Sequence, residues 1–316
     1  MKIAVLKGGF SPERDVSLVS GSEIGKELQH RGYEVVEFDP GAFPDSGAFF
    51  SALKAAAPDV VFNGLHGGSG EDGQLQAALS LQGFRSTGSG FKACVLAMDK
   101  YVSKMIAAAE GIPVPKYILM RENLIEDYND PEDYASFAAT LGLPIVVKPN
   151  DSGSSVGISV VDSLEELKPA VHKALEVSPT IILEEYIPGR ELTVTILDGK
   201  ALPVVEIKPV NGWYDYTNKY NKGKTHYEAP AQLDESTTQL VQLYALRIWR
   251  AMGLSGYARI DFRYDEQKPF FLEVNTLPGM TPLSLTPMAA KAADIPFGEL
   301  LQKIIEISLH NAGRYQ

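Results

Sequence analysis

Two short runs near the C-terminus alternate apolar and polar residues with a period of two. The runs are residues 258–262 and 271–275. This period predicts two β-strands, each with one apolar and one polar face. Arg259 and Asp261 share the polar face of the first strand, and Glu273 and Asn275 share that of the second. Because only the polar segment 263–269 separates the runs, we expect an antiparallel hairpin.

The four polar side chains of this hairpin share one face only if the strands pair in one particular register. A shift by one residue turns every side chain of a strand to the opposite face. We therefore predict that Asp261 lies opposite Glu273 and that Arg259 lies opposite Asn275. A regular hairpin with these pairs closes through an odd-numbered loop, which residues 266–268 would supply.

The polar face of the hairpin carries side chains that suit a metal and an anion. Asp261, Glu273 and Asn275 offer two carboxylates and an amide oxygen, hard ligands that suit Mg²⁺ bound together with phosphates. Arg259 suits an oxyanion that gains charge during a reaction. The following turn, 276–281, contains a Pro and a Gly and can present backbone N–H groups to an anion. The alternative for the hairpin alone is a solvent-facing pair of strands with one ion pair.

The first third of the chain has the pattern of a parallel α/β domain. Apolar strands are expected at residues 2–6, 34–38 and 59–63. Helical stretches separate them, and such alternation is typical of a parallel sheet. Ser11, Pro12 and Glu13 predict a helix start with an N-cap, a first position and an acidic first turn. The glycine loops 8–9 and 64–68 match neither the dinucleotide fingerprint nor the P-loop, which argues against both enzyme classes.

Composition excludes several further classes of protein. The chain has 316 residues, a hydrophobic content of 45% and a net charge of −11. This length allows two or three domains, and this charge argues against an extended nucleic-acid surface. The single Cys94 excludes an intramolecular disulfide and fits a reducing cytosol, and the five scattered histidines argue against a zinc site. No apolar run reaches the roughly 18 residues of a membrane span, and no signal-peptide pattern is present.

The middle of the chain predicts a second α/β segment after a change in composition at 88–90. Lys148 lies in a predicted strand that leads into the glycine- and serine-rich turn 150–158. The N–H groups of such a turn can cover phosphates, and the alternative is a plain hairpin turn. A strand, a turn and a second strand are expected over 181–191.

Two longer segments follow. Residues 213–224 interleave aromatic residues with lysines and lack a clear period. We interpret them as a lid that closes over an anionic ligand, with a nucleic-acid patch as the alternative. An amphipathic helix is predicted over 235–252, ending at Gly253.

Five blocks, in this order, resemble the ATP-grasp superfamily and more narrowly the D-alanine–D-alanine ligases of peptidoglycan synthesis. The blocks are GGFSPERDVS at 8–17, HGGSGEDG at 66–73, Met98-Asp99-Lys100, Lys148-Pro149 with GSSVG at 153–157, and NTLPGMT at 275–281. The resemblance spans essentially the whole chain. It implies an α/β protein with an N-terminal parallel-sheet (pre-ATP-grasp, Rossmann-like) domain followed by a two-lobed ATP-grasp fold. The implied divisions are a substrate domain at 1–95, a central lobe at 96–182 and a C-terminal lobe at 183–316.

The resemblance also implies an ATP site. Lys100 and Lys148 would contact the ATP phosphates, and the 153–157 loop would cover them. Glu184 and Glu191 would hold the adenine and the ribose. Further nucleotide-binding residues implied in this way are Ser154, Ser155, Glu185, Ile187 and Lys219.

Metal and substrate residues are implied in the same way. The ligands of two Mg²⁺ ions, for which Mn²⁺ can substitute, match Asp261, Glu273 and Asn275. The substrate residues match Glu13, His66, Arg259, Gly279, Ser284 and Leu285. Glu13 would bind the ammonium of the first D-alanine, Arg259 and the Gly279 N–H would stabilise the oxyanion, and Ser284 would hold the second carboxylate. The alternatives are that Glu13 stabilises a helix N-terminus and that His66 braces a loop.

Ser154 and Tyr220 match two members of a hydrogen-bonded triad with Glu13 that locks the lid. A tyrosine stays uncharged at pH 7, because its phenol has a pKa near 10. An uncharged Tyr220 does not repel an incoming ammonium group. We therefore predict that D-alanine is preferred over D-lactate as the second substrate.

The activity implied by the resemblance is the ATP-dependent joining of two D-alanine molecules through an acylphosphate, with release of ADP and phosphate. The implied enzyme is cytoplasmic and a homodimer, as family members commonly are, and it binds neither nucleic acid nor membrane. Two rivals stay open at this point. One is an ATP-grasp ligase that joins a different acid and amine, and the other is a regulatory nucleotide-binding protein with a degenerate site.

Overall fold

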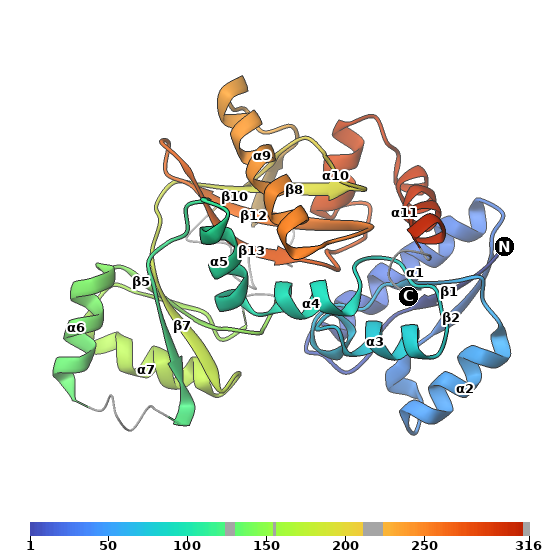
Figure 1. The fold of residues 1–316 in the computed structure, drawn as a ribbon, viewed down its shortest axis with the longest axis horizontal. Coiled ribbons are helices and arrows are strands. Elements are labelled where there is room, and N and C mark those ends of the chain that lie inside the picture. Colours follow the sequence, from blue (N-terminus) through green and yellow to red (C-terminus); the bar gives the residue numbers. More distant parts are fainter. Residues whose placement is uncertain (124–129, 154–155, 211–223, 312–316) are drawn as a thin grey trace.

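Three β-sheets follow one another along the described part of the chain (Figure 1). The computed structural model describes residues 1–123, 130–153, 156–210 and 224–311. The first sheet contains β1 (Lys2–Leu6), β2 (Glu34–Phe38) and β3 (Val60–Asn63). The second contains β4 (Tyr117–Arg121), β5 (Ile145–Pro149), β6 (Ser159–Val161) and β7 (Thr180–Glu185). The third contains β8 (Arg190–Leu197), β9 (Lys200–Ala201), β10 (Val205–Pro209), β11 (Thr225–Glu228), β12 (Tyr257–Tyr264) and β13 (Pro269–Asn275).

Helices cover these sheets and connect them. They are α1 (Arg14–His30), α2 (Ser46–Ala56), α3 (Gln74–Leu81), α4 (Phe91–Met98), α5 (Lys100–Ala109), α6 (Pro131–Leu141), α7 (Leu164–Leu175), α9 (Glu235–Met252), α10 (Leu285–Ala292) and α11 (Phe297–Asn311), with short 3₁₀ turns η1 (Pro40–Ala42) and η2 (Gly68–Gly70). In the ranges that the structure describes, every helix is too short or too polar to cross a bilayer.

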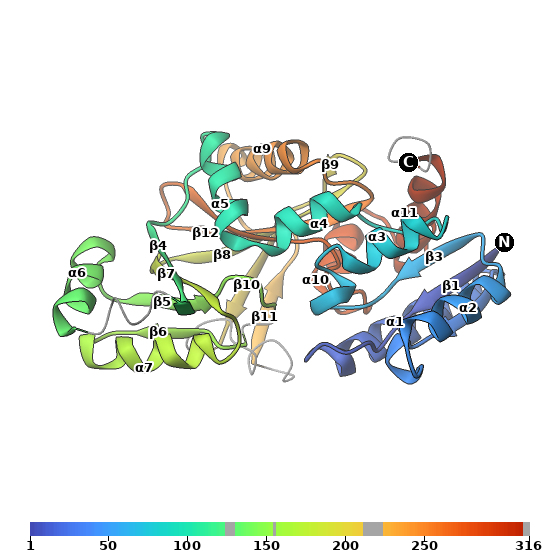
Figure 2. The same cartoon turned by 60° about the horizontal axis from the view of Figure 1, so that its bottom comes forward.

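The first sheet confirms the prediction of a parallel α/β domain. Its strand order is β2-β1-β3, and both strand pairs are parallel. One face packs against α2 through Phe49 and Leu53. The other packs against α1 through Ile24 and Leu28, in one core with residues of α10 and α11. The last helices of the chain thus fold back onto its first strands (Figure 2).

Helix α1 begins at Arg14 with Glu13 as its N-cap residue, so the prediction that Ser11 caps this helix is wrong. The Ser11 hydroxyl donates instead to the carbonyl oxygen of His66 at 2.5 Å and accepts the Glu13 N–H at 3.2 Å. The side chain expected to start the helix therefore ties the two glycine loops together. Glu13 is left at the junction of loop and helix.

The second sheet has the order β4-β7-β5-β6, with antiparallel neighbours. Helices α6 and α7 pack on it around Leu167 and Val171 (Figure 2). Strand β7 runs through the predicted boundary between residues 182 and 183. Because Glu184 and Glu185 still pair with β4 and β5, this sheet extends at least to Glu185. The division into domains itself stays a prediction.

The third sheet has the order β11-β10-β8-β12-β13 and is covered by α9. This helix spans the predicted residues, Glu235–Met252. The Asp234 carboxylate accepts the Thr237 N–H at 2.8 Å, and Gly253 ends the helix with a φ of 66°. Its buried residues recur at helical spacing: Thr237, Val241, Ala245, Ile248, Trp249 and Met252.

The β12–β13 hairpin confirms the predicted pairs and contradicts the predicted loop. Arg259 lies opposite Asn275 and Asp261 lies opposite Glu273. The register then shifts, so that Phe262 pairs with Phe271 and Tyr264 with Pro269. The loop is therefore the even-numbered 265–268. A β-bulge takes up the extra residue and keeps the polar side chains on one face, so the assumption of a regular hairpin was wrong.

Candidate active site

The polar face of β12 and β13 is built around Asp261, which is 6% exposed. Its carboxylate accepts the Thr193 hydroxyl at 2.6 Å from neighbouring β8. The Arg259 guanidinium donates to both carboxylate oxygens, with Nε and Nη2 each as close as 2.9 Å. The Asn275 amide donates to the same carboxylate at 2.9 Å. The hairpin register therefore brings together three of the residues that the sequence singled out.

Lys100, at the start of α5, joins this face to the loop after β5. Its Nζ lies 3.3 Å from a carboxylate oxygen of Glu273 and donates to the carbonyl oxygen of Ser152 at 2.7 Å. The same loop is tied to α5 through Asn150, whose carbonyl oxygen accepts the Lys100 N–H at 3.1 Å. The expected phosphate-covering loop is thus anchored to the helix that carries a predicted phosphate-binding lysine.

Glu184 lies buried between two lysines. Lys148 lies 2.9 Å from one carboxylate oxygen, and Lys104 lies 2.6 Å from the other. Burial would raise the pKa of the Glu184 carboxyl, but the attraction of Lys104 and Lys148 lowers it below its usual value. Burial, partly offset by Glu184, lowers the pKa of Lys104 to about 8. The Lys148 strand, the Glu184 strand and α5 therefore meet at one charged cluster.

Lys104 was missed by the sequence reasoning. It lies four residues after Lys100, so the two side chains share one face of α5. That spacing, next to a lysine already singled out, was the available signal. Its ammonium is fully buried and also lies 5.9 Å from the centre of the Phe271 ring.

Three further predicted nucleotide residues, Glu185, Ile187 and Glu191, lie between the end of β7 and the start of β8. Glu185 accepts the Lys116 N–H at 3.1 Å. The carbonyl oxygen of Ile187 accepts Arg263 Nε at 3.1 Å, and the Glu191 carboxylate lies 3.5 Å from the same guanidinium. Their roles at a nucleotide stay predictions.

His66 is buried between the first sheet and the third. Its Nδ1 lies 2.9 Å from the carbonyl oxygen of Leu277, and its Nε2 lies 2.9 Å from the Ser20 hydroxyl. Burial lowers the pKa of His66, although the Glu13 carboxylate acts in the opposite direction. A neutral ring satisfies both contacts by donating from Nδ1 and accepting at Nε2. His66 therefore braces the turn after β13.

Glu13 lies where two glycine loops approach each other. A Cβ built on Gly67 or on Gly153 would collide with the Glu13 carboxylate. The absence of a side chain at these two positions thus lets both loops approach the acid. Gly153 belongs to the predicted phosphate loop, so the Glu13 carboxylate lies between that loop and the glycine loop after β3.

The turn after β13 brings Gly279 next to Ser284. The Ser284 hydroxyl accepts the Thr281 N–H at 3.1 Å, and a Cβ on Gly279 would lie 3.0 Å from the Ser284 oxygen. Leu285 begins α10 immediately afterwards. The predicted oxyanion donor and the predicted carboxylate-binding hydroxyl are therefore neighbours.

Four predicted site residues lie outside the described residues: Ser154, Ser155, Lys219 and Tyr220. The lid expected over 213–224 falls almost entirely in the same undescribed part. Their roles stay predictions.

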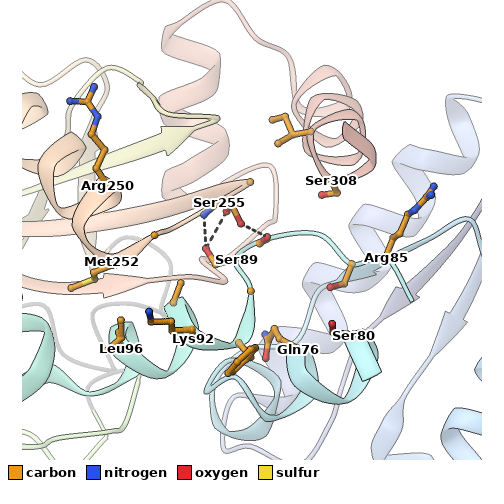
Figure 3. Close-up of a pocket in the computed structure, with 18 of the residues that line it drawn as sticks. Gln76, Ser80, Arg85, Ser89, Lys92, Leu96, Arg250, Met252, Ser255 and Ser308 are labelled. Carbon is orange, nitrogen blue, oxygen red and sulfur yellow. Dashed lines mark hydrogen bonds between the residues drawn. The ribbon is translucent and has the colours of Figure 1, made fainter. Parts of the chain in front are cut away.

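Two cavities flank this site. One, of about 380 Å³, adjoins His66 and is lined by Phe43, Phe49 and Phe50. The other, of about 610 Å³, lies where the loop 88–90 crosses the start of β12. Figure 3 shows the hydrogen bonds between Ser89 and Ser255 at this crossing, whereas Arg85, Lys92 and Arg250 point away from one another. Of the predicted site residues that the structure describes, none lines the larger cavity.

The order of the sheets, with a charged edge between the second and third, is that of the ATP-grasp superfamily. A family model described as the D-ala D-ala ligase C-terminus matches residues 106–306. A D-alanine–D-alanine ligase from Gloeobacter violaceus is 44% identical over 311 residues, covering 98% of this chain and 100% of that protein. The chain belongs to the D-alanine–D-alanine ligase family.

Solved structures agree with this assignment. The D-alanine–D-alanine ligase from Bacillus anthracis complexed with ATP is 33% identical, with 100% of both chains covered and a TM-score of 0.86. The VanG D-Ala:D-Ser ligase from Enterococcus faecalis is 29% identical, covering 97% of this chain and 99% of that chain, with a TM-score of 0.81.

Proposed function

We propose that this chain is an ATP-dependent ligase that joins two D-alanine molecules into D-alanyl-D-alanine for peptidoglycan precursor synthesis. One observation carries the proposal: the Arg259, Asp261 and Asn275 cluster lies on the same hairpin as Glu273, which the phosphate-side Lys100 approaches at 3.3 Å. Family membership over nearly the whole chain supports it. The complete set of Asp261, Glu273 and Asn275 on the hairpin, with Lys100 beside Glu273, argues against the rival of a degenerate regulatory protein.

The hairpin fits a pair of Mg²⁺ ions, with Mn²⁺ as a substitute. Asp261, Glu273 and Asn275 provide hard oxygen ligands on facing positions of β12 and β13. Within the described ranges, no three His, Cys, Asp or Glu side chains could hold a metal by themselves. This donor set suits Mg²⁺, which keeps few protein ligands and takes the rest from phosphates and water. When bound, Mg²⁺ neutralises charge on the transferring phosphoryl group.

The chain's own residues would divide the remaining work. Lys100 and Lys148 would bind the phosphates of ATP, with Glu184, Glu185, Ile187, Glu191 and Lys219 around the nucleoside and Ser154 and Ser155 in the covering loop. Glu13, beside His66, would orient the ammonium of the first D-alanine so that its carboxylate receives the γ-phosphoryl group. Arg259 and the Gly279 N–H would stabilise the oxyanion when the second amine attacks the acylphosphate. Ser284, with Leu285, would hold the second substrate's carboxylate.

Water must be excluded while the acylphosphate exists, because it would otherwise hydrolyse. The proposed lid, with Tyr220 bonded toward Ser154 and Glu13, would provide this exclusion. Gly153, which the structure describes, already lies beside Glu13 and supports this arrangement.

The test is to measure phosphate release and the product with ATP, Mg²⁺ and a panel of second substrates. We expect D-alanyl-D-alanine as the main product and little ester when D-lactate is in excess at pH 7. D-serine is the most informative competitor of D-alanine in this panel, because one similar structure is a D-Ala:D-Ser ligase. A mainly D-alanyl-D-serine or ester product would overturn the specificity, and no ATP turnover with any D-amino acid would overturn the function.

We also propose a cytoplasmic homodimer. ATP is an intracellular metabolite, which supports the location. Phe91 and Val95 lie one turn apart on α4 and are 56% and 51% exposed. Two large apolar side chains exposed together support a subunit contact. Sedimentation of the wild type and of Phe91→Asp tests it, since the variant should be monomeric if this helix forms the contact.

A further inference from the structure

The carboxylate of Glu71 receives backbone N–H groups from two distant parts of the chain. One oxygen accepts the Gly67 N–H at 3.1 Å, within the glycine loop of the first sheet. The other accepts the N–H groups of Thr276 at 3.1 Å and Leu277 at 3.0 Å, in the turn after β13. Glu71 therefore bridges the first-substrate side and the turn that carries the proposed catalytic N–H.

A second side chain, that of His66, binds the same turn at the other polar backbone group of Leu277. The Leu277 carbonyl oxygen lies 2.9 Å from His66 Nδ1, and the Leu277 N–H donates to Glu71. Both polar backbone groups of Leu277 are thus bound by side chains of the N-terminal region. Leu277 is flanked by Asn275 and Gly279, each two residues away. Fixing Leu277 therefore fixes the backbone between a proposed metal ligand and the proposed oxyanion donor.

The other end of the bridge lies beside Glu13. The Gly67 backbone packs against the Glu13 carboxylate so closely that a side chain at this position would collide with it. Glu71 holds the N–H of that same Gly67. One carboxylate thus joins the loop against the proposed ammonium site to the turn of the proposed oxyanion site.

A carboxylate is the side chain that this arrangement requires. Its two oxygens accept in different directions, whereas a glutamine offers one acceptor and one NH₂ donor. The NH₂ group would face an N–H group on one side of the bridge. The charge of Glu71 is also opposed by nearby Glu13 and favoured by Arg259. The site therefore keeps an acid despite a like charge beside it.

We propose that Glu71 is a positioning residue that sets the separation between the first D-alanine's ammonium site and the oxyanion and metal face of the hairpin. This inference rests on the proposed ligase function. It predicts that loss of Glu71 misplaces the first substrate relative to Gly279 and Arg259 while the lysine-lined ATP site is unaffected.

The test compares Glu71→Gln with Asp72→Asn at pH 8. Asp72→Asn is the matched control, because it makes the same kind of change one residue away, at a carboxylate that accepts from the Gln74 backbone and side chain at 2.9 and 2.7 Å. Four quantities are measured in each protein: kcat, the KM for D-alanine, the Kd for ATP by calorimetry, and amide hydrogen exchange of the segment 274–280.

For Glu71→Gln we expect kcat to fall about 10- to 100-fold, the size of effect that a misplacement near 1 Å produces. The KM for D-alanine should rise, the Kd for ATP should stay at the wild-type value, and exchange in 274–280 should accelerate. Asp72→Asn should match the wild type in all four. Should Glu71→Gln not fold, Glu71→Asp gives the same test, because its shorter side chain cannot reach both sides.

A folded Glu71→Gln with wild-type kcat, KM and hydrogen exchange would overturn the proposal. A loss of ATP affinity as large as the loss of kcat would also overturn it, since that result indicates a general disruption of the fold. A wild-type protein that forms no D-alanyl-D-alanine would instead refute the proposed function, and the hydrogen-exchange comparison would still decide whether Glu71 clamps the turn.

Discussion

Two glutamates at opposite ends of the site, Glu184 and Glu71, have pKa values shifted in opposite directions, although burial alone would raise both. Lys104 and Lys148 lower the pKa of the Glu184 carboxyl despite its burial. Burial and the neighbouring Glu13 raise the pKa of Glu71 to about 7, because its contacts are neutral N–H groups. Burial alone therefore does not decide the charge of an acid, and the charge of its partners does.

The surroundings of these two glutamates also indicate two different roles. The lysine cluster around Glu184 places buried positive charge where ATP phosphates are expected. The N–H groups around Glu71 instead fix the backbone where the amino acid is expected. Changes on the first side should alter stability and nucleotide use, and changes on the second should alter amino-acid use.

Lys104→Met should give the largest effect. It removes one of the two cations beside the buried Glu184, so we expect the free energy of unfolding to fall by about 3–5 kcal/mol. Denaturant unfolding measures this. Lys303→Met is the control, since it breaks an exposed pair with Glu299 at 3.2 Å and should change stability by less than about 1 kcal/mol.

A double-mutant cycle sharpens this prediction. Lys104→Met combined with Glu184→Gln should be more stable than the two single losses added together, because the uncompensated charge is gone. Simple additivity would mean that Lys104 contributes through packing rather than through its charge.

Arg259→Met tests whether the guanidinium acts on the amino-acid side or on the nucleotide side of the site. Loss of an oxyanion donor typically lowers kcat by about 10²–10³. ATP affinity should be largely unchanged, because Arg259 bonds to Asp261 on the hairpin, whereas the lysine cluster surrounds Glu184. Steady-state kinetics and calorimetry with ATP measure both quantities, with the exposed Arg250→Met as the control. An Arg259→Met enzyme with normal kcat and a raised KM for ATP would show that the guanidinium serves the nucleotide instead.

Glu273→Gln should act on the nucleotide side. It removes one negative charge from the proposed Mg²⁺ ligands, so the Mg²⁺ concentration for half-maximal activity should rise at least about tenfold. Titration of activity with Mg²⁺ measures this, and Glu266→Gln in the hairpin loop is the control. An unchanged Mg²⁺ requirement would place the metal elsewhere.

The smallest effect concerns pH and Glu71. Its pKa is raised from 4.5 to about 7, so the folded protein keeps the proton that the unfolded chain loses. The stability of the wild type relative to Glu71→Gln should therefore fall as the pH rises from 4.5 to about 7 and level off above that. Unfolding of both proteins across this range measures the difference. A difference that rises with pH would contradict the raised pKa.

Local pattern predicted most of the elements. The period-two runs predicted β12 and β13 and the pairs Asp261–Glu273 and Arg259–Asn275. Helical spacing with Gly253 predicted α9 residue for residue. The even hairpin loop was not predictable in this way, because a bulge adds an unpaired residue to one strand, and the alternation of the two runs does not record it. The Ser11 cap failed similarly, since the hydroxyl binds the distant His66 carbonyl.

The sequence by itself determined the strands, the main helix, the family and most of the proposed site residues, because alternation, capping and long motif blocks are local properties. Only the tertiary structure decided the partners of Lys104 and Glu71. From its neighbours in the sequence, Lys104 is an ordinary lysine on a helix. Glu71 is likewise an ordinary acid in a glycine-rich loop. Their roles depend on Glu184 and Leu277, which lie 80 and 206 residues away in the chain. Burial and pairing across such separations set the charge of a side chain, and no local pattern records them.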